Sequence, residues 1–283
     1  MSLPTKITVI GAGSTSFGEN TLAALMQSRK LRGSTLALVD RNPSSLDIVK
    51  RLADRLNREW DSAMTISAHS HHKDALDGAS FVVNAIEVGP REELWKSDFE
   101  IPLKYGVRQP YAENGGPGGF AHAARNAGPI LEIVRAMEQD CPDAWFINYT
   151  NPMVRICDLV NRHSTIKSVG LCHQLMIGYV FVGMTLGDAI GVEVPEGISG
   201  MHAGDPLTTP GREHVLQQTL PLIDIRAAGT NHFSWILSIR DRRTGEDLYP
   251  LFRERWAAIP EDFEPLTRRV FDAFGLFPVP GDT

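Results

Sequence analysis

The chain has 283 residues, enough for one large domain or two smaller ones. Its 28 Lys and Arg residues against 34 Asp and Glu residues leave a net charge of −6, which argues against a partner with a phosphate backbone or an anionic lipid surface. Three cysteines are too few for a secreted disulfide scaffold, and no apolar stretch has the length of a signal peptide or a membrane span. We therefore expect a cytoplasmic enzyme that binds neither nucleic acid nor membrane.

The first part of the chain alternates short apolar strands with amphipathic helices. Strands are expected at 6–10, 35–39, 64–68, 81–85, 145–148 and 167–170, and helices at 20–28, 43–60 and about 127–139. Alternation with short connections predicts a parallel sheet with right-handed crossovers. The fold class is therefore α/β, a Rossmann-like doubly wound sheet, with a dinucleotide-binding domain at 1–175.

After about residue 175 the pattern changes. Residues 197–213 are rich in Gly, Pro and Thr, a composition typical of an excursion between regular elements. Strands are expected at 223–225 and 233–239, and the chain stops in the turn-like segment 278–283. We expect 176–283 to form a truncated α+β catalytic domain that binds substrate and metal.

The turn after the first strand is the clearest local signal. Gly11 and Gly13 allow a tight turn and let a pyrophosphate approach the helix N-terminus, where free N–H groups and the helix dipole favour an anion. The usual third glycine is missing, because Ser16 stands there and a glycine follows only at Gly18. A tight strand–helix turn without a ligand is the alternative interpretation.

An acidic residue ends the second strand. Asp40 is placed to accept hydrogen bonds from both ribose hydroxyls of NAD and to repel a 2′-phosphate, although Arg41 weakens the exclusion of NADP. A helix-capping role for Asp40 is the alternative.

Four further segments carry polar groups at expected strand or helix ends. The glycine-rich run 115–119 precedes a helix expected near Phe120 and is either a ligand cradle or a surface loop. Asn151 follows a strand and precedes a proline, so it is either a cleft residue or part of a turn. Cys172 with His173 could bind a metal, act as nucleophile and base, or be core residues. His232 could be a satisfied histidine at a strand end.

Together these segments resemble glycoside hydrolase family 4, the NAD- and manganese-dependent glycosidases. The matching segments are GAGSTSFG at 11–18, LVD ending at Asp40, VVNAIEVGPREE around Asn84 and Arg91, IPLKYGV at 101–107, GGPGGF at 115–120, FINYTNPM at 146–153, GLCHQ at 170–174 and GTNHFSW at 229–235. They follow the order of the family over nearly the whole chain. The tail, from 250–254 to 278–283, is similar to the branch that contains α-galacturonidases, beside the α-galactosidases and α-glucosidases.

The resemblance implies a role for each matched residue. It assigns NAD binding to Gly11, Gly13, Ser14, Thr15, Phe17, Asp40, Arg41 and Asn84. It assigns Mn²⁺ to Cys172 and His232, and substrate contacts to Arg91, Glu113 and Asn151. His173 is the candidate general acid and Asp282 the candidate base, and a histidine after the metal-site cysteine goes with non-phosphorylated α-glycosides.

The implied mechanism differs from the two-carboxylate scheme of most glycosidases. The family oxidises the sugar at C3 with NAD⁺, removes the acidified C2 proton, eliminates the leaving group, adds water and returns the hydride. The implied partners are a small glycoside substrate and further copies of the chain, as a dimer or tetramer.

The sequence departs from the family in two respects, and two other functions compete with that of a glycosidase. Cys172 and His232 are 60 positions apart (232 − 172), so 197–222 has the character of an insertion, and His202 inside it is an alternative metal ligand. The resembling proteins are also longer than this chain. The competing functions are an NAD-dependent dehydrogenase of the lactate/malate type and a non-catalytic NAD-binding protein.

Overall fold

The computed structural model describes residues 3–14, 18–109, 114–195 and 210–279. The chain divides into two compact units, Met1–Leu171 and Cys172–Thr283. This division lies four residues before the boundary drawn from the sequence (175 − 171), so Cys172 and His173 begin the second unit.

The first unit is built on a six-stranded parallel sheet of order β3-β2-β1-β4-β5-β6. Its strands are β1 (Lys6–Ile10), β2 (Thr35–Val39), β3 (Thr65–His69), β4 (Phe81–Asn84), β5 (Trp145–Asn148) and β6 (Lys167–Gly170). The Rossmann-like doubly wound sheet expected from the sequence is confirmed. The strand order reverses at β1, so the carboxyl ends of β1 and β4 form the switch point at which such sheets bind ligands.

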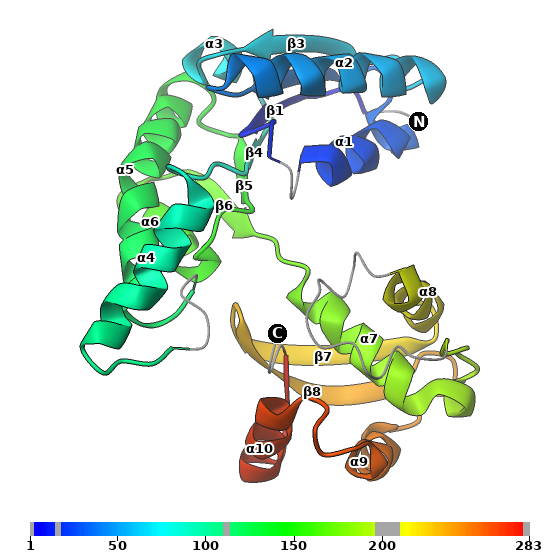
Figure 1. Cartoon of the computed structure of the whole chain (residues 1–283). Coiled ribbons are helices and arrows are strands. Elements are labelled where there is room, and N and C mark those ends of the chain that lie inside the picture. Colours follow the sequence, from blue (N-terminus) through cyan, green and yellow to red (C-terminus); the bar gives the residue numbers. More distant parts are fainter. Residues whose placement is uncertain (1–2, 15–17, 110–113, 196–209, 280–283) are drawn as a thin grey trace. The chain divides into compact units, whose positions relative to one another are not determined.

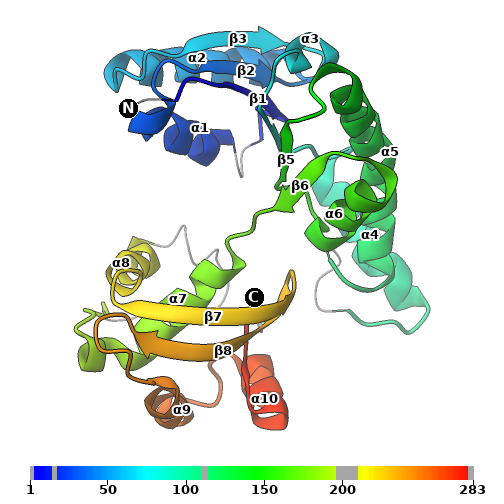
Figure 2. The ribbon, with the colours of Figure 1, turned by 180° about the vertical axis from the view of Figure 1, so that it is seen from behind.

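Helices cover both faces of this sheet (Figure 1, Figure 2). One face packs on α1 (Gly18–Gln27) and α2 (Pro43–Glu59), and the other packs on α3 (Lys73–Leu76), α5 (Gly116–Asp140) and α6 (Met153–His163). The alternation of β1 explains this, because Ile7 and Val9 enter the first core whereas Ile10 enters the second. Helix α4 (Arg91–Lys104) packs against α5, and a short 3₁₀ turn, η1 (Arg29–Leu31), follows α1.

The glycine-rich run starts a helix instead of forming a loop before one. Helix α5 begins at Gly116, ahead of the starts near Phe120 and Ala127 expected from the sequence. Pro117 fits the first turn because its missing N–H would have no partner there. A Cβ on Gly119 would lie 2.6 Å from the Asn114 carbonyl carbon, so the glycine permits close packing of the helix start.

The second unit joins helices to a three-stranded antiparallel sheet of order β7-β8-β9, which agrees with the α+β character expected for this region. Its elements are α7 (Gln174–Leu186), η2 (Gly187–Ile190), α8 (Pro210–Thr219), β7 (Ile223–Thr230), β8 (Phe233–Asp241), α9 (Tyr249–Ala258), α10 (Pro265–Phe274) and β9 (Phe277–Val279). Aromatic side chains fill its core: the rings of Phe252 and Trp256 lie 5.0 Å and 4.7 Å from that of Phe277.

Helix α7 has no apolar stripe, because nearly every residue along it is apolar or buried. Such a helix is surrounded by protein and gives no periodic pattern in the sequence, which explains why no helix was expected at 174–186. In the described part of the chain, no helix is long and apolar enough to cross a membrane.

Candidate functional site

The turn after β1 lies over the carboxyl end of β4. Gly11 has φ +79°, and a Cβ there would lie 2.5 Å from the Ala85 carbonyl oxygen. A Cβ on Gly13 would lie 2.6 Å from Ser45 Cβ and 2.8 Å from Asp40 Oδ2. Both glycines are therefore required by neighbouring protein atoms, whether or not a ligand is bound.

A later glycine takes the packing role of the missing third one. Helix α1 begins at Gly18, whose N–H donates to the Ser14 carbonyl at 2.8 Å. A Cβ on Gly18 would lie 2.5 Å from the Ala12 carbonyl oxygen. The turn is thus longer than the usual glycine-rich turn, and Ser14 lies inside it; Thr15 and Phe17 fall outside the described residues.

Asp40 reaches from the end of β2 to this turn. The Gly13 N–H donates to Asp40 Oδ2 at 2.8 Å, and the Asn42 N–H donates to Oδ1 at 2.8 Å. The cap of α2 is Asn42, whose side chain accepts from Ser44 and Ser45 N–H, so the capping alternative for Asp40 is wrong. The neighbouring Arg41 is exposed.

Buried amides join the ends of β4 and β5. Asn84 is fully buried, and its Nδ2 donates to Asn148 Oδ1 and to Thr150 Oγ1, each at 2.9 Å. Thr150 Oγ1 in turn donates to the Ile86 carbonyl at 2.8 Å. Asn84 therefore holds the two strand ends together, and its Oδ1 accepts no hydrogen bond from any described residue.

Charged groups gather where the β4 end meets α4 and α5. His122 is fully buried, and its Nε2 lies 3.0 Å from Glu87 Oε1. Burial raises the pKa of Glu87, but the hydrogen bond and charge of His122 and the charge of Arg91 outweigh it, so the pKa is lowered. The Arg91 guanidinium stacks 4.1 Å above the Trp95 ring.

A second ion pair braces these helices. Arg125 on α5 binds the buried Asp98 of α4 through two hydrogen bonds, of 2.9 and 2.5 Å. The hydrogen bonds that Arg125 donates to Asp98 raise the Arg125 pKa, so the guanidinium stays charged.

Asn151 follows β5, and its peptide bond to Pro152 is cis. Its Oδ1 accepts from the Met153 N–H at 3.3 Å, and its carbonyl accepts from Nδ2 of the buried Asn126 at 3.3 Å. The loop that carries Asn151 is thus fastened to both α6 and α5.

In the second unit, Cys172 and His232 come together. Cys172 Sγ lies 3.4 Å from His232 Nε2, although the two residues are 60 positions apart. His232 lies in the two-residue loop of the β7–β8 hairpin, so it does not follow an isolated strand end. Its φ of +61° is uncommon for a residue with a Cβ and matches the positive φ that two-residue hairpin loops require.

These two side chains fit a divalent metal. For zinc, whose bonds are near 2.3 Å to sulfur and 2.0–2.1 Å to nitrogen, adjacent sulfur and nitrogen ligands lie about 3.1–3.6 Å apart. The observed separation of 3.4 Å falls in this range. No cluster of three His, Cys, Asp or Glu residues that could hold a metal exists within the described ranges. A metal held here would keep positions open for other ligands, as catalytic metal sites do.

The other two cysteines lie in the first unit and have raised pKa values. Burial raises the pKa of Cys141 to about 11, and burial also raises the pKa of Cys157. Both behave as small apolar groups.

Three further residues of the sequence analysis lie outside the described residues: Glu113, His202 and Asp282. Three residues with contacts at the candidate sites were not predicted from the sequence: Glu87, His122 and Gln174. The buried acid–histidine pair has no local signal, since its members lie 35 positions apart. Gln174 directly follows the Cys172-His173 dipeptide, and this adjacency is the feature of the sequence that could have indicated its role.

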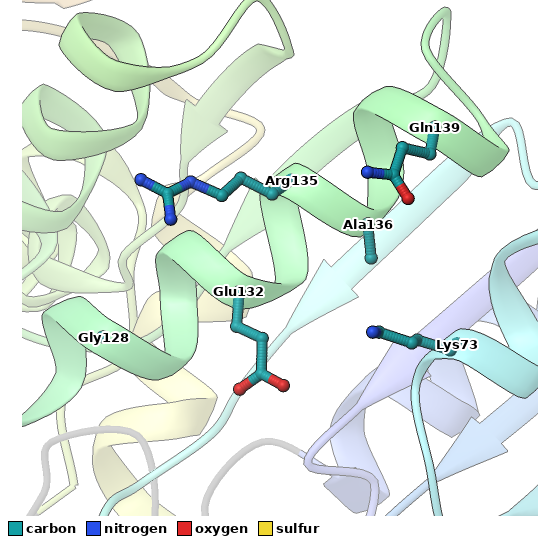
Figure 3. A pocket seen from close by; sticks show the side chains of 6 residues that line it. All are labelled: Lys73, Gly128, Glu132, Arg135, Ala136 and Gln139. Atoms are coloured by element: carbon teal, nitrogen blue, oxygen red, sulfur yellow. The ribbon is translucent and has the colours of Figure 1, made fainter.

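A shallow pocket of about 210 Å³ lies on the first unit between α3 and α5 (Figure 3). Its lining is Lys73, Gly128, Glu132, Arg135, Ala136 and Gln139. In Figure 3 the Arg135 guanidinium points away from Lys73, so the two cations do not converge on one point. None of the predicted site residues lines this pocket.

Comparisons with known proteins match both parts of the chain. The model described as "Family 4 glycosyl hydrolase" matches residues 6–185, and the model of the C-terminal domain of that family matches 227–283. The α-glucosidase of Erwinia rhapontici is 37% identical over 265 residues, which cover 93% of this chain and 51% of that enzyme.

Solved structures share the fold. The Bacillus subtilis protein lplD superposes with a TM-score of 0.78 at 26% identity, over 99% of this chain and 61% of that one. A 6-phospho-α-glucosidase from gut microorganisms, crystallised with NAD and Mn²⁺, has a TM-score of 0.74 at 18% identity, over 98% of this chain and 59% of that one. The chain spans about half the length of the curated relatives it matches.

Proposed function

The chain belongs to family 4 of the glycosyl hydrolases, and on this basis we propose that it carries the NAD and metal sites of a glycosidase for non-phosphorylated α-glycosides. The observation that carries the proposal is the pair Cys172 and His232, with sulfur and nitrogen 3.4 Å apart. The α-glucosidase relative supports the substrate class, and the structure with NAD and Mn²⁺ supports the cofactors.

In the first unit, the switch-point turn suits a dinucleotide. Gly11 and Gly13 let the turn pack closely on Ala85, Ser45 and Asp40, and α1 follows the turn at Gly18 with its free N–H groups. We assign the pyrophosphate to this turn, with Ser14, Thr15 and Phe17, and the ribose hydroxyls to Asp40 beside Arg41. When bound, NAD would supply a reversible hydride acceptor for the sugar C3, which acidifies the C2 proton.

Arg91, Glu113 and Asn151 are proposed to contact the sugar. The Asn151 side-chain oxygen accepts the Met153 N–H and its backbone carbonyl accepts Asn126 Nδ2, so its amide is held in place before substrate arrives. Asn84 stabilises this loop through the hydrogen bonds that it donates to Asn148 and Thr150.

In the second unit, Cys172 and His232 are proposed to hold the metal. When bound, a divalent ion would act as a Lewis acid for the oxygens at C2 and C3. A thiolate with an imidazole accepts Mn²⁺, whereas Zn²⁺ binds such a pair more tightly.

His173 is proposed to donate a proton to the glycosidic oxygen. It occupies the N-cap position of α7, where its carbonyl accepts the Met176 N–H at 2.8 Å. His173 is half-buried, so part of its surface is open to a substrate. Asp282 is proposed as the base that removes the C2 proton.

Turnover in D₂O tests this function. The protein is supplied with NAD⁺, Mn²⁺, a reductant and an aryl α-glucoside or α-galactoside, and the released sugar is examined by NMR. We expect deuterium at C2 and no net NADH, because the hydride returns to C3. Cys172→Ser should abolish release. Released sugar without C2 deuterium, or NADH accumulating in proportion to substrate as in a dehydrogenase, would refute the proposal.

We also propose that the protein is a homo-oligomer and that it is located in the cytoplasm. Apolar side chains stay exposed on and after α4, among them Ile101, Leu103 and Tyr105, and patches of this kind mark contact surfaces. Light scattering in solution should give the mass of a dimer or tetramer, and a monomer at micromolar concentration would contradict it.

A further inference from the structure

We propose that Gln174 is a positioning residue of the candidate metal site, acting through its side-chain oxygen on the loop that carries His232. The inference rests on the proposed function, since it takes Cys172 and His232 as metal ligands. It concerns the buried residue that contacts both of their segments.

Gln174 is the first residue of α7 and is only 6% exposed. Its Oε1 accepts the His232 backbone N–H at 2.7 Å and the Asn231 Nδ2 group at 3.3 Å. Its own backbone N–H points to Cys172 Sγ at 3.4 Å. Gln174 therefore contacts the Cys172 thiol directly, and it positions the His232 imidazole through the backbone of His232.

The hairpin loop needs such an anchor. His232 has φ +61°, a conformation that a side chain with a Cβ seldom adopts without support. The His232 N–H donates to Gln174 in a partly buried place, where an unpaired N–H is unfavourable. Without the acceptor, the loop would relax toward ordinary φ and carry the imidazole away from Cys172.

The two ends of the side chain have separate partners. The Nε2 group donates to the Val279 carbonyl of β9, and the Oε1 group holds the hairpin loop. The donor end therefore fastens a strand, whereas the acceptor end orients a ligand. Loss of a group that orients a metal ligand reduces affinity about 10- to 100-fold.

Two substitutions separate these roles. Gln174→Met keeps the volume and removes both ends, and Gln174→Glu keeps an acceptor for the His232 N–H but loses the donor to Val279. Gln174→Asn shortens the side chain by one methylene, and it replaces Gln174→Met in the experiment if the Met variant does not fold. Thr185→Val is the matched control, because Thr185 is buried in the same helix and its hydroxyl has no hydrogen-bond partner among the described residues.

The probe is Co²⁺ added to the metal-free protein, with Kd measured by titration and cysteine ligation by the thiolate-to-cobalt absorption band. Thermal unfolding of each metal-free variant is recorded alongside. We expect Gln174→Met, and likewise Gln174→Asn, to weaken Co²⁺ binding at least tenfold. Gln174→Glu should stay within threefold of the wild type although it unfolds at a lower temperature, and Thr185→Val should bind as the wild type does.

Wild-type affinity and absorption in Gln174→Met would overturn the inference, as would equal losses in Gln174→Met and Gln174→Glu that follow their unfolding temperatures. The proposed function fails differently. A wild type without a cobalt–thiolate band, or a band that survives in Cys172→Ser, refutes the metal assignment and the inference with it. A band that Cys172→Ser removes and Gln174→Met leaves intact refutes the inference alone.

Discussion

Asp40 lies at the carboxyl end of β2 with both carboxylate oxygens bonded to backbone N–H groups, those of Gly13 and Asn42. Each oxygen has further lone pairs that a ribose hydroxyl could use. Asp40→Ala should weaken NAD binding at least tenfold, the change that corresponds to about 1.4 kcal/mol. Isothermal titration calorimetry measures it.

The control for this prediction is Asp47→Ala, which removes an exposed carboxylate of α2 that pairs only with Arg51 among its described contacts. Its NAD affinity should equal that of the wild type. Unchanged affinity in Asp40→Ala would contradict the ribose assignment.

Glu87 should contribute a pH-dependent stability. Its pKa is lower in the folded protein than in the unfolded chain, despite the opposing effect of burial, because His122 and Arg91 favour the carboxylate. A lowered pKa stabilises the fold at pH values above the unfolded pKa of about 4.3, and this contribution disappears as the pH falls through the folded pKa.

Glu87→Gln should therefore lower the free energy of unfolding by about 1–2 kcal/mol at pH 7, because it removes the charge from the hydrogen bond with His122 at a partly exposed position. The difference from the wild type should shrink as urea unfolding is repeated from about pH 5 toward pH 3. Glu92→Gln, an exposed neighbour on α4, should show no such effect. A difference that stays constant over this pH range would show that the charge of Glu87 is not responsible.

At the level of elements, α2 begins with a cap that a substitution can isolate. The Asn42 side chain accepts from the Ser44 N–H at 3.0 Å and the Ser45 N–H at 3.3 Å. Asn42→Ala should lower the free energy of unfolding by about 1 kcal/mol, and Asn42→Asp should retain it, since a carboxylate also caps a helix. Urea unfolding is the measurement, and equal stability of the two variants would argue against the cap.

The contact between α7 and α8 depends on a glycine. A Cβ on Gly183 would collide with Thr219 Oγ1 and would lie 2.6 Å from Val215 Cγ1. Gly183→Ala should destabilise the protein by about 1–3 kcal/mol through overpacking.

The double variant Gly183→Ala/Thr219→Ala tests the cause. Removing the Thr219 hydroxyl relieves the closest contact and leaves the one with Val215 Cγ1, so the double variant should be more stable than the sum of the two single effects predicts. Additive effects in thermal unfolding would place the strain elsewhere.

At the scale of the whole molecule, each ligand should protect its own unit. NAD at about 100 times its Kd adds about 2.7 kcal/mol to the stability of the state that binds it. Hydrogen exchange should slow at 11–14 and 40–42 with NAD, and at 172–174 and 230–233 with Mn²⁺. Mn²⁺ that leaves 230–233 unprotected would contradict the assignment of His232.

Local patterns in the sequence predicted the six strands of the first unit to within one residue at each end. The helices were predicted less well, because α3, α4 and α6 were not expected and α5 begins before its predicted start. The strands 6–10 and 35–39, and the helix that starts at Pro43, agree with β1, β2 and the start of α2. These elements are coded by neighbouring residues: β-branched runs form strands, and the turn glycines allow the backbone to reverse. The fold class followed from their order alone, and the family followed from motifs that keep their order along the chain.

Only the tertiary structure decided which side chains meet. Cys172 faces His232 over 60 positions, Gln174 binds the His232 N–H over 58, and His122 binds Glu87 over 35. Helix α7 also escaped detection, because a helix buried on all sides has no apolar stripe. Contacts of this kind depend on how distant elements pack, and no local periodicity encodes that packing, so the anchor of the loop that carries His232 became visible only in the folded chain.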